Sequence, residues 1–239
     1  MKYMKSTRSI LILLLLLFTG AACTININRG LVSYYPFDGN ADDKSGNSNH
    51  GTIDGASLTA DRYGNENSAF SFNGAGNTIQ VNIKNMSSTD APVSFSWWFY
   101  IDTLPMFTTR SGAQNMIVLV NRNEGTGIQV GFRSPGYNTL GFDTWVWGGG
   151  TLLQANLPEP GKWNHCVYTY DGSENRFYLN GIEQARSAEK IPKGEPTELM
   201  FGNYPSGKQY FEGKLDDIRI YNRSIGLNEI DRLFKEVRK

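Results

Sequence analysis

Short apolar runs that fit β-strands, separated by turn residues, recur along most of this 239-residue chain. The strongest run covers residues 93–101, where Val93, Phe95, Trp97 and Phe99 would share one side of a strand. Comparable runs extend from about residue 30 to about residue 221. Because these runs are short and regularly spaced, the pattern predicts an all-β fold of antiparallel strands.

Turn dipeptides mark where several of these strands would reverse direction. Asp171-Gly172 and Asn180-Gly181 stand between strand-like runs. Such pairs favour the type I′ turns of β-hairpins, because both turn positions need a positive φ. Only residues 227–237 carry apolar side chains at helical spacing. We therefore expect a two-sheet antiparallel β-sandwich or jelly roll with one short C-terminal helix.

The first 22 residues have the features of a secretory signal rather than of a folded domain. Basic residues precede an apolar run over residues 10–18, and small residues then lead to Cys23. This run of nine residues is about half of the ~20 residues that a membrane-spanning helix needs. We expect residues 1–22 to be removed and the remainder to be exported.

Cys23 adds a lipid anchor to this expectation. Small residues directly before a cysteine resemble the lipobox of bacterial lipoproteins, although Gly20 stands where that motif usually has an aliphatic residue. The resemblance implies a lipid on Cys23 as the one membrane contact, residues 23–29 as a short tether, and an outer-membrane or cell-surface location. Ordinary cleavage after Ala22, giving a periplasmic or secreted protein, is the alternative.

Charge and cysteine content narrow the picture mainly by exclusion. The formal net charge is zero and the basic residues form no stripe, so the charge pattern of nucleic-acid binding is absent. Cys166 is the only cysteine besides Cys23, so a lipidated chain would contain no disulfide. Residues 30–239 have the size of one sandwich domain, and with no oligomerisation signal in the sequence we expect a monomer.

Four segments, at residues 30–51, 63–74, 161–181 and 213–223, carry a family resemblance. The first contains Gly-Leu-Val-Ser-Tyr-Tyr-Pro-Phe-Asp-Gly-Asn, and the last contains Gly-Lys-Leu-Asp-Asp-Ile-Arg-Ile-Tyr-Asn-Arg. Together they resemble the laminin-G-like jelly roll of the concanavalin A-like lectin/glucanase superfamily, in the family's order. The resemblance implies one jelly-roll domain over residues 30–239. Since this fold hosts lectins, adhesion modules and glycosidases, it implies no single activity.

An acidic loop at residues 38–43 offers oxygen donors of the kind that Ca²⁺ binds. Related jelly rolls often hold a structural Ca²⁺ where this loop meets an acidic pair on the last strand. The resemblance implies a calcium site formed by Asp38, Asn40, Asp43 and Asp216. Strand alternation would let only one member of the acidic pair face the ion. The alternative is that these side chains only form turns.

The sequence gives little support for catalysis. The β-glucanases of this superfamily carry Glu-x-Asp-x-x-Glu on one strand, whereas the nearest string here, residues 229–234, ends in Phe and has a helical pattern. Asp143 is the only acid in the runs 93–101 and 140–147, although glycoside hydrolysis needs two carboxylates. We expect a protein that is not an enzyme, with a glycoside hydrolase as the least favoured alternative.

Aromatic residues provide the candidate ligand site. Trp145 and Trp147 would share one side of a strand that is followed by glycines, with Asp143 beside them, and Trp98 lies in the run 93–101. Indole rings stack on the C–H faces of sugars while polar side chains bond the hydroxyls, so these residues predict a glycan site. Core packing of the same rings is the alternative. The leading hypothesis is a non-catalytic, lectin-like module for a glycan or polysaccharide. A protein-binding or adhesion module of the cell envelope is the runner-up.

Overall fold

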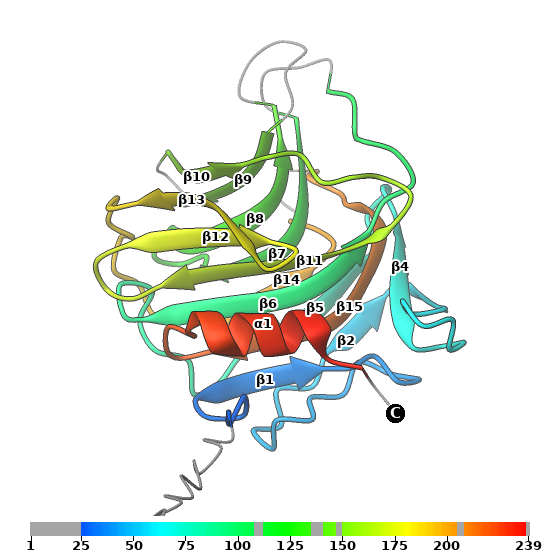
Figure 1. Ribbon diagram of the computed structural model, residues 1–239, viewed down its shortest axis with the longest axis horizontal. Helices are drawn as coiled ribbons and strands as arrows, with labels where there is room; N and C mark the ends of the chain where they lie inside the picture. Colours follow the sequence, from blue (N-terminus) through cyan, green and yellow to red (C-terminus); the bar gives the residue numbers. More distant parts are fainter. Residues whose placement is uncertain (1–24, 108–111, 135–140, 147–149, 205–207, 238–239) are drawn as a thin grey trace, which may run out of the picture.

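The computed structural model describes residues 25–107, 112–134, 141–146, 150–204 and 208–237. Its strands form two antiparallel sheets that pack face to face, which confirms the predicted β-sandwich (Figure 1). Sheet A contains β1 (Leu31–Tyr35), β3 (Ser57–Thr59), β4 (Ala69–Asn73), β6 (Val93–Tyr100), β11 (Trp163–Tyr170), β12 (Asn175–Leu179), β13 (Ile182–Ser187) and β15 (Glu212–Tyr221). Sheet B contains β2 (Thr52–Asp54), β5 (Thr78–Asn82), β7 (Ala113–Asn121), β8 (Thr126–Arg133), β9 (Gly141–Val146), β10 (Thr151–Ala155) and β14 (Glu198–Phe201). Helix α1 (Leu227–Lys235) follows the last strand.

The strand order places distant parts of the chain side by side. Sheet A has the order β13-β12-β11-β6-β15-β4-β3, with β1 also paired with β15, and sheet B has the order β10-β9-β8-β7-β14-β5-β2. The predicted hairpins join β11 to β12 and β12 to β13. Asn180 and Gly181 have φ values of 52° and 79°, so both turn residues adopt the positive φ that a type I′ turn requires.

The core between the two sheets is made by the strand sides that the alternating pattern predicts. The side of β6 that was predicted to be apolar is fully buried. The Phe99 ring centre lies 5.5 Å from that of Phe142 and 6.4 Å from that of Phe132, both in sheet B. Each fully buried side chain of this size stabilises the fold by roughly 1.5–3 kcal/mol. The alternating pattern therefore predicts correctly which side of β6 faces the other sheet.

Helix α1 lies across the outer face of sheet A, the face turned toward the viewer in Figure 1. Its Ile230 and Leu233 side chains pack in one cluster with Val167 of β11, Tyr178 of β12 and Tyr221 of β15. This packing explains why β6 and β11 are buried on both sides. Within the described ranges, no helix is both long and apolar enough to cross a membrane.

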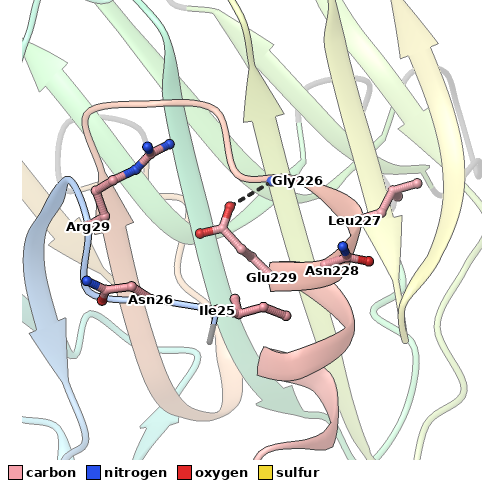
Figure 2. Close-up of a pocket in the computed structure, with 7 residues that line it drawn as sticks. All are labelled: Ile25, Asn26, Arg29, Gly226, Leu227, Asn228 and Glu229. Carbon is pink, nitrogen blue, oxygen red and sulfur yellow. Dashed lines mark hydrogen bonds between the residues drawn. The ribbon is translucent and has the colours of Figure 1, made fainter. Parts of the chain in front are cut away.

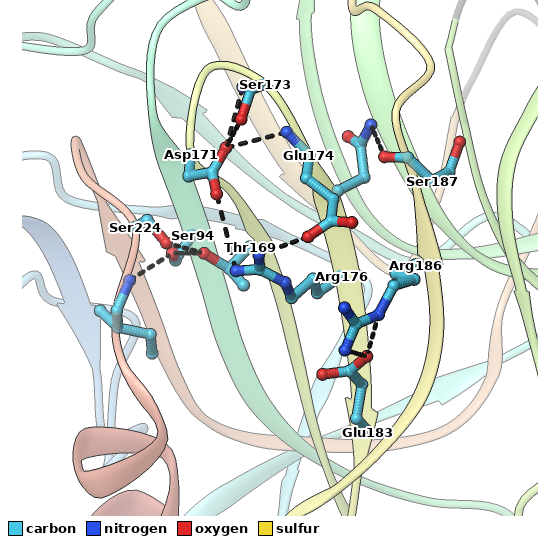
Figure 3. A network of polar contacts seen from close by, with 12 residues as sticks. Ser94, Thr169, Asp171, Ser173, Glu174, Arg176, Glu183, Arg186, Ser187 and Ser224 are labelled. Carbon is cyan, nitrogen blue, oxygen red and sulfur yellow. Dashed lines mark hydrogen bonds and ion pairs between the residues drawn. The ribbon is translucent and has the colours of Figure 1, made fainter.

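A buried hydroxyl network holds the connection between β15 and α1 on sheet A (Figure 3). Ser94 Oγ donates to the Arg223 carbonyl at 2.9 Å and accepts from the Ile225 amide at 3.1 Å. It also lies 2.8 Å from Thr169 Oγ1, which in turn lies 2.7 Å from Ser224 Oγ. The network therefore gives hydrogen-bond partners to the Arg223 carbonyl and the Ile225 amide in this connection.

Residues 25–29 pack against the domain, so the predicted tether is shorter than the sequence suggested. Ile27 is buried in the cluster beneath α1, and Arg232 of α1 donates to the Ile25 carbonyl at 2.7 Å. Thr24 alone separates this docked segment from Cys23. The predicted signal peptide and the lipidation site at Cys23 lie outside the described residues.

Candidate functional site

Several polar side chains lie on the outer face of sheet B. Ile128, Val130 and Phe132 of β8 point into the core, so the intervening Gln129 and Arg133 lie on the outer face. On β9, Phe142 and Val146 belong to the core, which puts the predicted ligand residues Asp143 and Trp145 on the outer face as well. We call Asn115, Gln129, Arg133, Asp143 and Trp145 the sheet B cluster.

Direct contacts connect the members of the sheet B cluster. Arg133 Nε lies 3.2 Å from Asp143 Oδ2, and its guanidinium carbon lies 5.4 Å from the centre of the Trp145 ring. Asn115 Nδ2 donates to Gln129 Oε1 at 3.2 Å and to Gln209 Oε1 at 2.6 Å. The contacts bring together three strands of sheet B and the segment before β15.

Two acceptor oxygens of this cluster are buried without a hydrogen-bond partner. Asn115 pairs with Gly131 across β7 and β8, and Gly131 pairs with Asp143 across β8 and β9, so the two polar residues flank a position without a side chain. A Cβ atom at residue 131 would lie 2.0 Å from the Gln114 carbonyl oxygen, which leaves room only for glycine. Asn115 Oδ1 and Asp143 Oδ1 are the two unpartnered atoms. Both can accept a hydrogen bond, but neither oxygen reaches the surface, so a ligand would contact them only after neighbouring side chains moved aside.

Burial determines the electrostatics of this site. Desolvation raises the pKa of the Asp143 carboxyl, and the Arg133 guanidinium opposes this shift. Asp143 is 1% exposed and Trp145 is 7% exposed, whereas the Arg133 side chain keeps 24% of its surface in solvent. The Trp145 ring, which the sequence pattern assigned either to a sugar site or to packing, is therefore largely covered. Trp147 lies outside the described residues.

Trp98, the fourth predicted ligand residue, lies on the opposite face of the molecule beneath α1. Its ring stacks on Phe234 with centres 5.8 Å apart, and the Arg62 guanidinium carbon lies 4.6 Å from its centre. His165 contacts the same ring at 5.0 Å. Trp98 therefore packs between sheet A and the helix, and it cannot contact the same ligand as Trp145.

Two of the residues predicted to bind calcium accept hydrogen bonds from protein groups instead. Asp43 Oδ1 accepts from the Tyr34 and Ser45 amides, and Asp43 Oδ2 accepts from the Ser45 hydroxyl and the Asn49 amide. The Asn40 Oδ1 atom accepts from a neighbouring amide in its own loop, and Asp38 is exposed. These contacts are those of a turn, the alternative reading of the loop.

The fourth predicted calcium ligand is engaged elsewhere. Asp216 is fully buried and forms an ion pair with Arg62 at 2.8 Å. In the described part of the chain, no three His, Cys, Asp or Glu side chains come together as a metal-binding group. The predicted ligands are thus engaged in hydrogen bonds and an ion pair with protein groups, and calcium binding stays a prediction of the sequence.

Comparison with known families decides the classification of the fold. A family profile described as the concanavalin A-like lectin/glucanases superfamily matches residues 73–231. This chain belongs to that superfamily. No curated protein sequence matches it.

Solved structures with the same concanavalin A-like architecture come from several kinds of protein. Domain 4 of AbnA, a GH43 extracellular arabinanase from Geobacillus stearothermophilus solved in complex with arabinotriose, has a TM-score of 0.68 and 19% identity, over 86% of this chain and 98% of that domain. The binding domain of Paraclostridial Mosquitocidal Protein 1 has a TM-score of 0.66 and 16% identity, over 87% of this chain and 52% of that one. Trypanosoma rangeli sialidase has a TM-score of 0.63 and 17% identity, over 86% of this chain but only 32% of its own. At these identities the likeness shows the fold.

This concanavalin A-like domain also has an open surface groove of about 610 Å³ beside the start of α1 (Figure 2). The groove is lined by Ile25, Asn26, Arg29, Gly226, Leu227, Asn228 and Glu229. Glu229, the one carboxylate among these residues, accepts from the Gly226 amide at 3.0 Å and pairs with Arg223. Its charge is therefore used to cap the helix and to hold the preceding loop.

Several residues of the sheet B cluster were missed by the sequence interpretation. Asn115, Gln129 and Arg133 were not among the predicted ligand residues. The signal that could have found Gln129 and Arg133 is local, because polar residues alternate with Ile128, Val130 and Phe132 on β8. Asn115 has no comparable signal, because its place beside Gly131 depends on the pairing of β7 with β8.

Proposed function

We propose that this protein is a non-catalytic carbohydrate-binding module whose ligand contacts the outer face of sheet B. The observation that carries the proposal is the unpartnered Asp143 Oδ1 atom, which is buried beside Arg133 and Trp145. A buried acceptor without a partner costs about 1–3 kcal/mol, and a hydroxyl that displaced the groups covering this oxygen would recover that energy. Sugars supply such hydroxyls in number.

Charge favours a neutral sugar as the ligand. Arg133 and Asp143 form an ion pair at 3.2 Å and so largely cancel each other's charge. Asn115 and Gln129 add uncharged amides to the same face. Because arabinotriose is the ligand in one structure of the same fold, arabino-oligosaccharides are a reasonable first probe.

The cluster supports binding better than hydrolysis. Asp143 is its one carboxylate, and hydrolysis of a glycosidic bond by the usual mechanisms requires a second carboxyl group at a defined distance. We therefore assign the site to recognition.

The direct test is a glycan array followed by calorimetric titration of arabinotriose and of every array ligand. We expect binding in the micromolar to millimolar range, and at least a tenfold weaker affinity for Asp143→Asn and for Trp145→Ala. Asp54→Asn, an exposed residue at the far edge of sheet B, is the matched control and should bind normally. If no glycan binds the folded protein, the adhesion hypothesis replaces this one.

We further propose that the module is exported and anchored to the cell envelope through a lipid on Cys23. Support comes from the signal-like sequence before Cys23 and from the docked segment that begins at Ile25. A single intervening residue spans at most about 7 Å between the flanking Cα atoms, so the anchored domain would lie close to the bilayer.

Metabolic labelling with a fatty acid tests the anchor. The wild-type protein and the control Cys166→Ala should incorporate the label, and Cys23→Ser should not. Absence of label from the exported wild-type protein would instead indicate cleavage after Ala22 and a soluble, unanchored product.

A further inference from the structure

The side chain of Arg62 is inserted into the fold against two buried carboxylates. Arg62 comes from the loop between β3 and β4, and only 5% of its side chain is exposed. Its Nη1 atom lies 2.8 Å from Asp216 Oδ2 and 2.5 Å from Asp217 Oδ2. Both carboxylate side chains are completely buried. The three residues form a compact ionic centre on the outer side of sheet A.

Both acids face Arg62 because β15 is irregular at this point. The sequence pattern predicted that only one of two successive strand residues would face a cation. The pairing of β15 with β6 shifts register between Asp216 and Arg219, and Asp217 adopts a φ of 50°. A β-bulge of this kind re-aims side chains, and so it brings two successive carboxylates to the same centre.

Aromatic rings and a hydroxyl complete the enclosure. The Arg62 guanidinium carbon lies 4.5 Å from the centre of the Tyr63 ring and 4.6 Å from that of Trp98. The Tyr34 hydroxyl donates to Asp217 Oδ1 at 2.8 Å. Placing a cation over aromatic faces adds to its attraction to the acids, since the ring faces carry partial negative charge.

The loop that carries Arg62 is arranged to present it. Asp61 Oδ1 accepts from the Tyr63 amide at 2.8 Å and from the Asn65 amide at 2.9 Å, which closes a tight turn around Arg62. The Tyr63 hydroxyl also donates to the Glu236 carbonyl just after α1. Arg62 thus connects the β3–β4 loop, the bulge of β15 and the region of the C-terminal helix.

We propose that the Arg62 guanidinium is a built-in cation that binds both acids of the Asp216–Asp217 pair, in place of the calcium ion that the sequence predicted for Asp216. Arg219, whose Nη1 atom lies 3.9 Å from Asp217 Oδ1, supplies the second positive charge. The donor chemistry supports this assignment, because a guanidinium supplies hydrogen bonds and one positive charge to the oxygens that a metal would need. The proposal is independent of glycan binding. It states that the ionic centre holds this part of the jelly roll together without a divalent ion.

Thermal unfolding of the purified protein tests the proposal. We expect the wild-type Tm to agree within about 1 °C in EDTA and in millimolar calcium. Arg62→Met removes the cation that contacts both buried acids and leaves only Arg219 beside Asp217, so we expect its Tm to fall by about 10 °C. Arg186→Ala, which removes an arginine that is 60% exposed, is the control and should leave the Tm nearly unchanged.

A second variant separates loss of charge balance from loss of packing. The triple variant Arg62→Met, Asp216→Asn, Asp217→Asn removes the acids together with the cation. We expect it to recover at least half of the Tm lost in Arg62→Met alone, and this variant remains informative if Arg62→Met fails to fold. A Tm of Arg62→Met equal to that of the wild type, no recovery in the triple variant, or a calcium-induced rise in the wild-type Tm that vanishes in Asp216→Asn would each overturn the proposal.

Discussion

Arg133 Nε contacts Asp143 Oδ2 at 3.2 Å, yet the other oxygen of the same carboxylate has no partner. Protein folds rarely leave a buried charged group half satisfied, because the missing hydrogen bond lowers stability. Here the unsatisfied oxygen belongs to a residue on the outer face of sheet B that pairs with Gly131, and it packs against Gly141. We propose that this oxygen binds a ligand hydroxyl.

Replacing Asp143 by Asn should weaken ligand binding without lowering stability at neutral pH. The pKa of Asp143 is raised in the folded protein, so its contribution to stability is present below about pH 3.8 and is lost as pH rises. An amide imitates the protonated form, and Arg133 is exposed enough to be hydrated. We expect a calorimetric Tm at pH 7 no more than about 2 °C below that of the wild type. A loss above 5 °C, absent from the Asp54→Asn control, would assign Asp143 to the fold.

Removing the indole of Trp98 should affect stability and not binding. Trp98 is 9% exposed and packs against Phe234 and Arg62 beneath α1. Trp98→Ala should lower the free energy of unfolding by about 3–5 kcal/mol, as other large buried aromatics do. Urea unfolding measures this change, and glycan titration well below the transition should give the wild-type affinity. Lost binding with an unchanged urea midpoint would return Trp98 to the ligand site.

Stability should fall in acid because of His165. Burial, together with the nearby Arg219 and Arg62 charges, lowers the pKa of this imidazole to about 3. The unfolded chain, with a histidine pKa near 6.5, then binds more protons than the folded protein between these values. The contribution of His165 is therefore present above pH 6.5 and is lost as pH falls toward 3, with a slope of at most about 1.4 kcal/mol per pH unit.

Chemical denaturation between pH 4 and pH 7 measures this dependence. His165→Asn should flatten the curve over this range, because it removes the buried titrating group. His50→Asn is the control, since the His50 side chain is 55% exposed. Equal slopes in the wild type and in His165→Asn would contradict the prediction.

The Ser94 hydroxyl should control how firmly α1 is attached. Ser94→Ala removes the acceptor of the Ile225 amide and the contact with Thr169. We expect a loss of about 1–3 kcal/mol in the free energy of unfolding. Hydrogen exchange should become faster in residues 225–235 before it does so in the core of sheet B. The control is Ser173→Ala, an exposed serine in the same view (Figure 3), which should leave the exchange unchanged.

The sequence by itself determined the sandwich, because the information needed for it is local. Alternation along residues 93–101 selects the buried side of β6, and the two Asn-Gly and Asp-Gly turns select antiparallel neighbours. Helical spacing likewise identified α1. The same alternation puts Asp143 and Trp145 on one side of β9, opposite the core residues Phe142 and Val146.

The tertiary structure alone decided how those sides are used. The alternating pattern predicts that Trp98 points away from the core between the sheets. Only the docking of α1, which comes more than 120 residues later in the sequence, shows that the outer face of sheet A is covered too. Alternation also assigned one acid of the Asp216–Asp217 pair to the wrong side, because a bulge changes the register locally. Arg62 reaches that pair from 154 residues away. Such contacts depend on the free energy of packing distant segments together, and no local pattern of side chains encodes it.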